Sequence, residues 1–304
     1  GEVVDWEQAS ADGKTHTVFA YAPKEYTPEK AWPLLVWLHG GVSRPSDGGG
    51  KSGVAMFKDE ADRAGFLVLS PSAQPEALWW TPAGLDLLRG SLREMARRYR
   101  IDPARVALSG FSDGGSGCFY VLAHDPTAYA CFLPMMGNPI VGRIYGGPTW
   151  SSNVSSRPVY AVNGGKDPLY PAARMAPIMD ELRDAGCDLT WIEEPESGHE
   201  PSFLAQRWNE MHDWWLEHTR DALPKRITWA TSVPHVDGRF AWVEIVSLDE
   251  KADAAEIDLP EEMEIPRSEP RPRLGIVLGP EFPGPGVRIR EVEEGTAAAE
   301  AGFE

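Results

Sequence analysis

The stretch RVALSGFSDGGSG, residues 105–117, contains a serine whose surroundings indicate a nucleophile. Ser112 has Gly110 two positions before it and Gly114 two positions after it, and an apolar run precedes all three. Glycines at these positions allow a strand to turn sharply into a helix, so that the serine hydroxyl is exposed at the strand end. A serine hydroxyl is a weak nucleophile, so catalysis also requires a base and a carboxylate elsewhere in the chain.

The base is expected to be one of the seven histidines, and the expected elements in which they lie distinguish them. His199, in EPESGHEP, lies on an expected loop between the last core strand and the last helix. Loops at strand ends are where the sites of α/β proteins form, so His199 is the candidate base. The others lie in expected helices or strands, in the turn LHGG or in a late hairpin: His16, His39, His124, His212, His218 and His235.

The carboxylate is expected in VYAVNGGKDPLYP, where Asp167 directly follows an apolar strand in a turn rich in glycine and proline. Asp188 is the weaker substitute. In the mechanism that these residues predict, His199 takes the proton of Ser112 and returns it to the leaving group. Asp167 holds the imidazole in the correct tautomer and stabilises the imidazolium.

Backbone donors are also needed, because each tetrahedral intermediate carries a negative oxygen. The N–H of Asp113, directly after the nucleophile, is one candidate. The second is expected in the turn HGGV, at Gly41, with Val42 as the alternative. The glycine-rich stretch that follows lacks the spacing of a phosphate-binding loop.

The elements around these residues alternate between strand and helix patterns. The run PLLVWLHGG, residues 33–41, is short, continuously apolar and closed by glycines, which is typical of a buried parallel strand. Similar strands are expected at 66–72 and 105–110, and amphipathic helices between them. The pattern predicts an α/β fold with a doubly wound, mainly parallel sheet and helices on both faces.

The pattern changes after Leu223, and we expect a small β-rich C-terminal extension. RITWATS and RFAWVEIVSL are expected to pair as two strands around the turn-prone VPHVDG. The acidic, proline-bearing stretch that follows is typical of an extended connector. The expected units are residues 1–223, 224–272 (hairpin and connector) and 273–304.

Composition limits the partners. A formal net charge of −17 and a pI near 4.9 argue against nucleic acid and anionic membranes. No apolar run approaches the roughly 20 residues that span a bilayer. The chain begins GEVVDWEQAS, without a signal-peptide pattern or an initiator Met; its compartment stays open, with a secreted or periplasmic one preferred. Without metal-type spacing, the cysteines are expected to be small buried hydrophobes: Cys118, Cys131 and Cys187.

The chain resembles the α/β-hydrolase superfamily, and within it carboxylesterases such as feruloyl esterases and polyhydroxybutyrate depolymerase-like enzymes. The resemblance rests on PLLVWLHGG, RIDPARVALSGFSDGGSG, NGGKDPLYP and SGHEP, which lie within residues 17–220. It implies a serine carboxylesterase that acts on a small or medium acyl ester through an acyl-enzyme, without metal or organic cofactor. Trp79 and Trp80 could line the substrate site, although core packing is an equal alternative.

Residues 273–304 resemble the beginning of a PDZ domain, with Leu274, Gly275 and Ile276 at the position of its carboxylate-binding loop. A peptide tail is the implied partner if the domain is complete, and a terminal hairpin is the alternative. Two other functions stay open for the chain. One is a serine peptidase of the same superfamily, and the other is a binding or scaffold protein.

Overall fold

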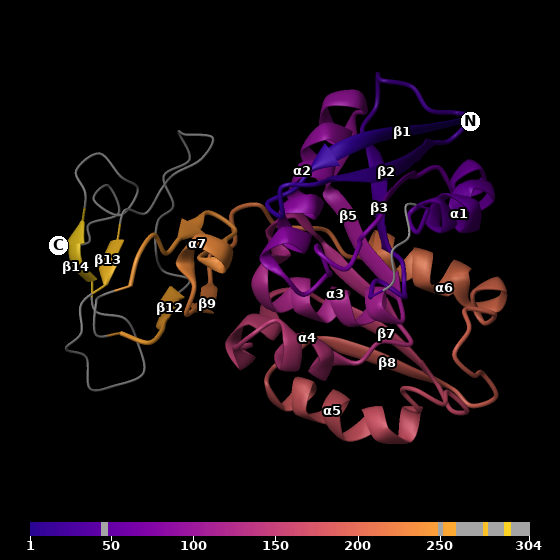
Figure 1. Cartoon of the computed structure of the whole chain (residues 1–304). Helices are drawn as coiled ribbons and strands as arrows, with labels where there is room; N and C mark the ends of the chain where they lie inside the picture. The colour runs from indigo at the N-terminus through magenta and orange to yellow at the C-terminus, as the bar shows by residue number, and fades with distance from the viewer. Residues whose placement is uncertain (44–47, 249–251, 260–275, 279–288, 293–304) are drawn as a thin grey trace.

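An eight-stranded sheet forms the centre of the protein (Figure 1). The computed structural model describes residues 1–43, 48–248, 252–259, 276–278 and 289–292. The sheet order is β1-β2-β4-β3-β5-β6-β7-β8; β3 to β8 are mutually parallel, and β1 and β2 are antiparallel additions at one edge. The strands are β1 Glu2–Ala9, β2 Thr15–Ala22, β3 Trp32–Leu38, β4 Leu67–Pro71, β5 Ile101–Phe111, β6 Cys131–Met135, β7 Val159–Gly164 and β8 Leu189–Glu194.

Helices cover both faces of this sheet, which confirms the predicted doubly wound, mainly parallel α/β architecture. One hydrophobic cluster packs α1 and α6 on one face, and a second packs α2, α3 and α5 on the other. Leu34 and Val36 of β3 join the second cluster and Leu35 joins the first, as expected for alternating side chains. The helices are α1 Lys51–Ala64, α2 Pro82–Arg98, α3 Asp113–His124, α4 Pro139–Tyr145, α5 Ala172–Asp184 and α6 Leu204–Glu217.

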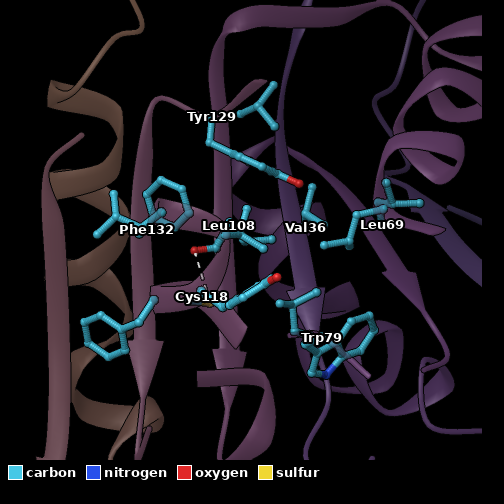
Figure 2. Close-up of a cluster of buried hydrophobic side chains, with 14 of the residues drawn as sticks. Val36, Leu69, Trp79, Leu108, Cys118, Tyr129 and Phe132 are labelled. Atoms are coloured by element: carbon cyan, nitrogen blue, oxygen red, sulfur yellow. Dashed lines mark hydrogen bonds between the residues drawn. The ribbon is translucent and has the colours of Figure 1, made fainter. Parts of the chain in front are cut away.

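The cluster beneath α3 fixes the helix that follows Ser112. Figure 2 shows Val36, Leu69 and Leu108 from neighbouring strands facing Cys118 of α3, with Trp79 beside them. These five side chains are at most 1 % exposed. Because such interiors are close-packed, the position of α3 relative to the strands is set to within small shifts.

The three cysteines are free and buried, as predicted, and burial raises the pKa of each thiol. They therefore behave as small apolar side chains. In the part of the chain that the structure describes, no helix combines the length and apolar character needed to cross a membrane.

His212 of α6 lies among the rings of Phe66, Trp208 and Trp215, and burial lowers its pKa below the 6.5 of an exposed histidine. Between that lowered pKa and about pH 6.5 the unfolded chain binds more protons than the folded one, so acidification through this range lowers the free energy of unfolding. We expect His212→Leu to lose less stability than wild type between pH 7 and pH 5 in urea unfolding. Equal losses in the two proteins would contradict this.

The C-terminal extension departs from the predicted hairpin. β9 (Ile227–Thr231) pairs antiparallel with β12 (Ala255–Leu259), whereas β10 (Arg239–Phe240) and β11 (Val243–Glu244) pair with each other. β12 lies in the segment expected to be a connector. Its sequence AEIDL alternates, with the apolar side chains buried and the acidic ones exposed, so the acidic composition concealed a half-buried strand.

Several contacts join this extension to the helical layer around α3. His124 at the end of α3 contacts Asp237 of α7 (Pro234–Asp237), with 2.6 Å between Nδ1 and Oδ2. Asn153, in a short helix at Ser151–Ser156, exchanges hydrogen bonds with the backbone of Ala230. Arg89 of α2 donates to the carbonyl of Val236. The extension is therefore held to the sheet domain by buried polar contacts as well as by the chain.

The predicted PDZ-like segment lies largely outside the described residues, including Leu274 and Gly275. Within it, β13 (Ile276–Leu278) and β14 (Ile289–Val292) form an antiparallel pair.

Candidate active site

Ser112 sits on a sharp turn between β5 and α3. Its φ of 58° and ψ of −117° are unusual for a residue with a side chain, and such strain is typical of a nucleophile held at a strand end. The neighbouring glycines are required because there is no room for a side chain at their positions. A Cβ at Gly110 would overlap the backbone of Gly114, and one at Gly114 would overlap the carbonyl of Leu38.

This close approach predicts a large cost for Gly114→Ala. The added methyl group meets backbone of β3, which is central in the sheet and cannot move without disturbing its neighbours. We expect the free energy of unfolding to fall by about 3 kcal/mol or more. Gly48→Ala is the matched control: no described atom lies within 4 Å of its added carbon, and its effect is expected within about 0.5 kcal/mol. Equal unfolding midpoints in denaturant for Gly114→Ala and Gly48→Ala would contradict the conclusion that only glycine fits at position 114.

Asp167 and His199 lie on two loops that are hydrogen-bonded to each other. After β7, the N–H of Gly165 donates to the carbonyl of Glu194, the last residue of β8, and the N–H of Lys166 donates to the carbonyl of Ser197 in the loop that carries His199. A Cβ on Gly164 would lie 2.5 Å from the carbonyl oxygen of Ser197. This packing explains the glycines of NGGKD, because they allow the acid loop to lie directly on the histidine loop.

The structure brings the three predicted side chains into one hydrogen-bonded line. His199 Nε2 lies 2.8 Å from Ser112 Oγ, and His199 Nδ1 lies 2.7 Å from Asp167 Oδ2. Asp167 is 2 % exposed, and its other oxygen accepts the N–H groups of Leu169 and Tyr170 at 2.7 and 2.9 Å. An ionised carboxylate can only accept, so Nδ1 carries the proton and Nε2 is left to accept the serine proton.

The other candidates from the sequence lie elsewhere. Asp188 directly precedes β8, at the opposite end of the strand from the triad loops, and is exposed. His16 and His124 are paired with Asp12 and Asp237. His39 belongs to the turn after β3, as predicted.

Two hydrogen bonds of the His39 ring hold that turn. Its Nε2 accepts the N–H of Ala73 at 3.0 Å, so its Nδ1 carries the proton and donates to the carbonyl of Gly40 at 2.8 Å. Burial lowers the pKa of His39, which favours this neutral form. Gly40 lies against the nucleophile, since a Cβ there would be 2.9 Å from Ser112 Cβ. The turn is thus built on a neutral buried imidazole.

Gly41 and Val42, the two alternatives for the second backbone donor, differ in their surroundings. Gly41 has a φ of 70°, which favours glycine, and no described atom lies within 4 Å of the position of a Cβ. The N–H of Val42 donates to Asp113 Oδ2 at 3.0 Å. The N–H of Val42 is therefore already hydrogen-bonded, which leaves Gly41 as the candidate second donor.

The two tryptophans proposed as substrate contacts are buried. Trp79 is 0 % exposed, its Nε1 donates to the carbonyl of His39 at 2.9 Å, and its side chain packs over Gly117. Trp79 therefore holds the turn after β3 from within the core, in agreement with the core-packing alternative. Trp80 is 6 % exposed, and its carbonyl lies beside Gly146, directly after α4.

The sequence did not single out the aromatic and apolar side chains beside the triad. The ring of Tyr170 lies 5.9 Å from that of His199. Burial raises the pKa of Tyr170, and the nearby Asp113, Asp167 and Tyr145 raise it further. Leu169 and Tyr145 are 57 % and 70 % exposed.

A cavity of about 370 Å³ lies between α3, α4 and α5, with Phe119, Tyr120 and Trp150 among its lining. None of the triad residues lines it. Among the described residues, no group of three or more His, Cys, Asp or Glu side chains could hold a metal ion.

Comparison of the fold with solved structures gives its class. A thermostable esterase matches with a TM-score of 0.59 at 18 % identity, over 72 % of this chain and 63 % of that one. An acylaminoacyl peptidase from Pyrococcus horikoshii matches with a TM-score of 0.57 at 12 % identity, over 72 % of this chain and 42 % of that one. The chain has the α/β-hydrolase fold, as the resemblance implied.

Curated relatives are similar over part of their length. A bifunctional acetylxylan esterase/xylanase from Neocallimastix patriciarum is 26 % identical over 175 residues, which are 57 % of this chain and 24 % of that protein. A protein described as a carboxymethylenebutenolidase from Yersinia pestis is 30 % identical over 142 residues, which are 42 % of this chain and 53 % of that protein. The matches thus span between a quarter and about half of these relatives. No protein-family model matches the chain.

Proposed function

We propose that this chain is a serine hydrolase that cleaves carboxylic esters through an acyl-enzyme. The observation that carries the proposal is the continuous line from Ser112 through His199 to Asp167, at 2.8 and 2.7 Å. Relatives described as an acetylxylan esterase and a carboxymethylenebutenolidase favour an ester or lactone over a peptide bond. No step needs a metal or an organic cofactor.

In the proposed reaction, Ser112 Oγ attacks the ester carbonyl while His199 Nε2 takes its proton. The imidazolium is stabilised by the buried Asp167 carboxylate, and then protonates the departing alcohol. The N–H groups of Asp113 and Gly41 stabilise the oxyanion. Water, activated by the same histidine, attacks the acyl-enzyme, and Ser112 is released with the carboxylic acid product.

The substrate that we propose is a small or medium acyl ester. Leu169 and Tyr170, directly after the acid, provide an apolar and aromatic surface beside His199. Trp80 is not part of this proposed surface, because its side chain is buried. Nucleic acid is not among the proposed partners, because a net charge of −17 repels phosphate.

Hydrolysis of p-nitrophenyl esters from acetate to octanoate, with methyl ferulate alongside, tests the proposal. We expect turnover of at least one ester, with a preference for a particular acyl length or for the aromatic acid. A peptidase would instead cleave acyl-peptide substrates faster than any ester, and a scaffold protein would cleave neither. Folded protein without any esterase activity would contradict the proposal.

The division into units at 223 and 272 and the PDZ-like segment at 273–304 stay predictions. Recognition of a peptide tail depends on the second of these. The contacts of α7 and β9 with α3 and the helix at Ser151–Ser156 support a C-terminal extension fixed to the hydrolase unit.

A further inference from the structure

We propose that the side chain of Asp113 is a positioning group, which holds the turn after β3 so that the N–H of Gly41 faces the oxyanion. This inference rests on the proposed function and adds a side chain to the same site. It also explains how the two backbone donors, which follow two different strands, β5 and β3, keep a fixed separation.

The supporting contact links the two halves of the oxyanion site. Asp113 is the first residue of α3, and its backbone N–H is one proposed donor. Its carboxylate Oδ2 accepts the N–H of Val42, the neighbour of the other proposed donor, at 3.0 Å. One residue therefore supplies the first donor and fixes the backbone next to the second.

The turn is held at its start and at its end by different groups. Trp79 and the His39 ring hold the carbonyls of His39 and Gly40. Beyond Gly41, the side chain of Val42 is completely buried, and Asp113 accepts its N–H. Gly41 itself is exposed, and its lack of a Cβ makes its backbone more flexible than that of other residues. Without the Asp113 contact, the peptide unit between Gly41 and Val42 loses its hydrogen bond, and the unit that carries the Gly41 N–H is held only through the bond of His39 to the carbonyl of Gly40.

The position of the carboxylate also fits the helix. An acidic side chain in the first turn is favoured by the partial positive charge of the N-terminus of α3. An acceptor oxygen is what the Val42 N–H needs, so asparagine can replace aspartate in this role, whereas alanine cannot.

The test compares Asp113→Ala with Asp113→Asn in the full chain, using p-nitrophenyl acetate. Removing an oxyanion donor outright costs about 10²–10³-fold in kcat, and we expect a misaligned one to cost about 10–100-fold. Asp113→Ala is therefore expected to lower kcat by that amount while KM changes less than about threefold. Asp113→Asn, which keeps an acceptor oxygen for the Val42 N–H, is expected to retain at least tenfold more kcat than Asp113→Ala.

A second readout does not depend on turnover. In ¹H–¹⁵N spectra, the amide resonances of Gly41 and Val42 are expected to move in Asp113→Ala and to stay near their wild-type positions in Asp113→Asn. Unchanged kcat together with unchanged amide resonances in Asp113→Ala would overturn the positioning role. If wild type cleaves no ester, the proposed function fails, and unmoved resonances in Asp113→Ala then overturn the inference separately.

Discussion

Ser112→Ala is expected to lower kcat for the preferred p-nitrophenyl ester by about 10⁴-fold or more, because the nucleophile, the general base and the acid act as one unit. The alanine removes only the oxygen that lies 2.8 Å from His199 Nε2, so the fold is expected to persist. Alanine keeps the Cβ of a residue with a φ of 58°, so the substitution does not relieve the backbone strain. Stopped-flow and steady-state kinetics measure the change.

The matched control for this variant is Ser155→Ala, which removes an exposed hydroxyl that bonds only within its own short helix. Its kcat is expected to equal that of wild type. Activity in Ser112→Ala within tenfold of this control would show that another residue is the nucleophile.

Asp167→Asn is expected to lower kcat by about 10⁴-fold with little change in KM. The carboxylate oxygens accept from His199 Nδ1 and from the N–H groups of Leu169 and Tyr170. An asparagine can keep the two backbone contacts through its oxygen, and its NH₂ group then faces Nδ1. The imidazole would then expose a protonated Nε2 to Ser112, which cannot accept the serine proton.

Asp188→Asn serves as the control for this prediction. It makes the same change directly before β8, at the edge of the sheet opposite to Asp167. Wild-type kcat is expected for it. Two variants with equal activity would refute the choice of acid, and a loss confined to Asp188→Asn would reverse it.

The parts of the fold that the sequence predicts best are those in which local pattern and burial agree. The continuous apolar run of β3 and the strand expected at 66–72, which is β4, have the predicted positions. The convergence of Ser112, Asp167 and His199 was predictable because parallel strands place their carboxyl ends at one edge of the sheet, whatever the separation of the residues in sequence.

The sequence pattern does not predict two of the strands, β1 and β12, and each case has a physical reason. β1 alternates between exposed and half-buried residues and gains its stability from pairing with β2 along its whole length, which composition does not reveal. β12 is acidic on one side and pairs with β9 across an intervening stretch of chain. Partner choice between strands depends on tertiary packing, and alternation alone does not determine it.

The details of the site were less predictable than its triad. The choice between Gly41 and Val42 as donor depends on a contact between Val42 and the side chain of Asp113, 71 positions apart. The buried position of Trp79 depends on a carbonyl 40 positions away. Residue types and spacing indicate which groups could act as oxyanion donors or substrate contacts. Contacts between residues far apart in the sequence decide which of these groups are already hydrogen-bonded or buried.

The most direct test of the central claim is mass spectrometry of the protein after reaction with a fluorophosphonate. A single adduct is expected on the peptide that contains Ser112. Its formation should be slowed by an ester substrate, and it should be absent from Ser112→Ala and retained in Ser155→Ala. A folded wild-type protein that stays unmodified, or an adduct on a different residue, would contradict a nucleophilic Ser112 activated by His199 and Asp167.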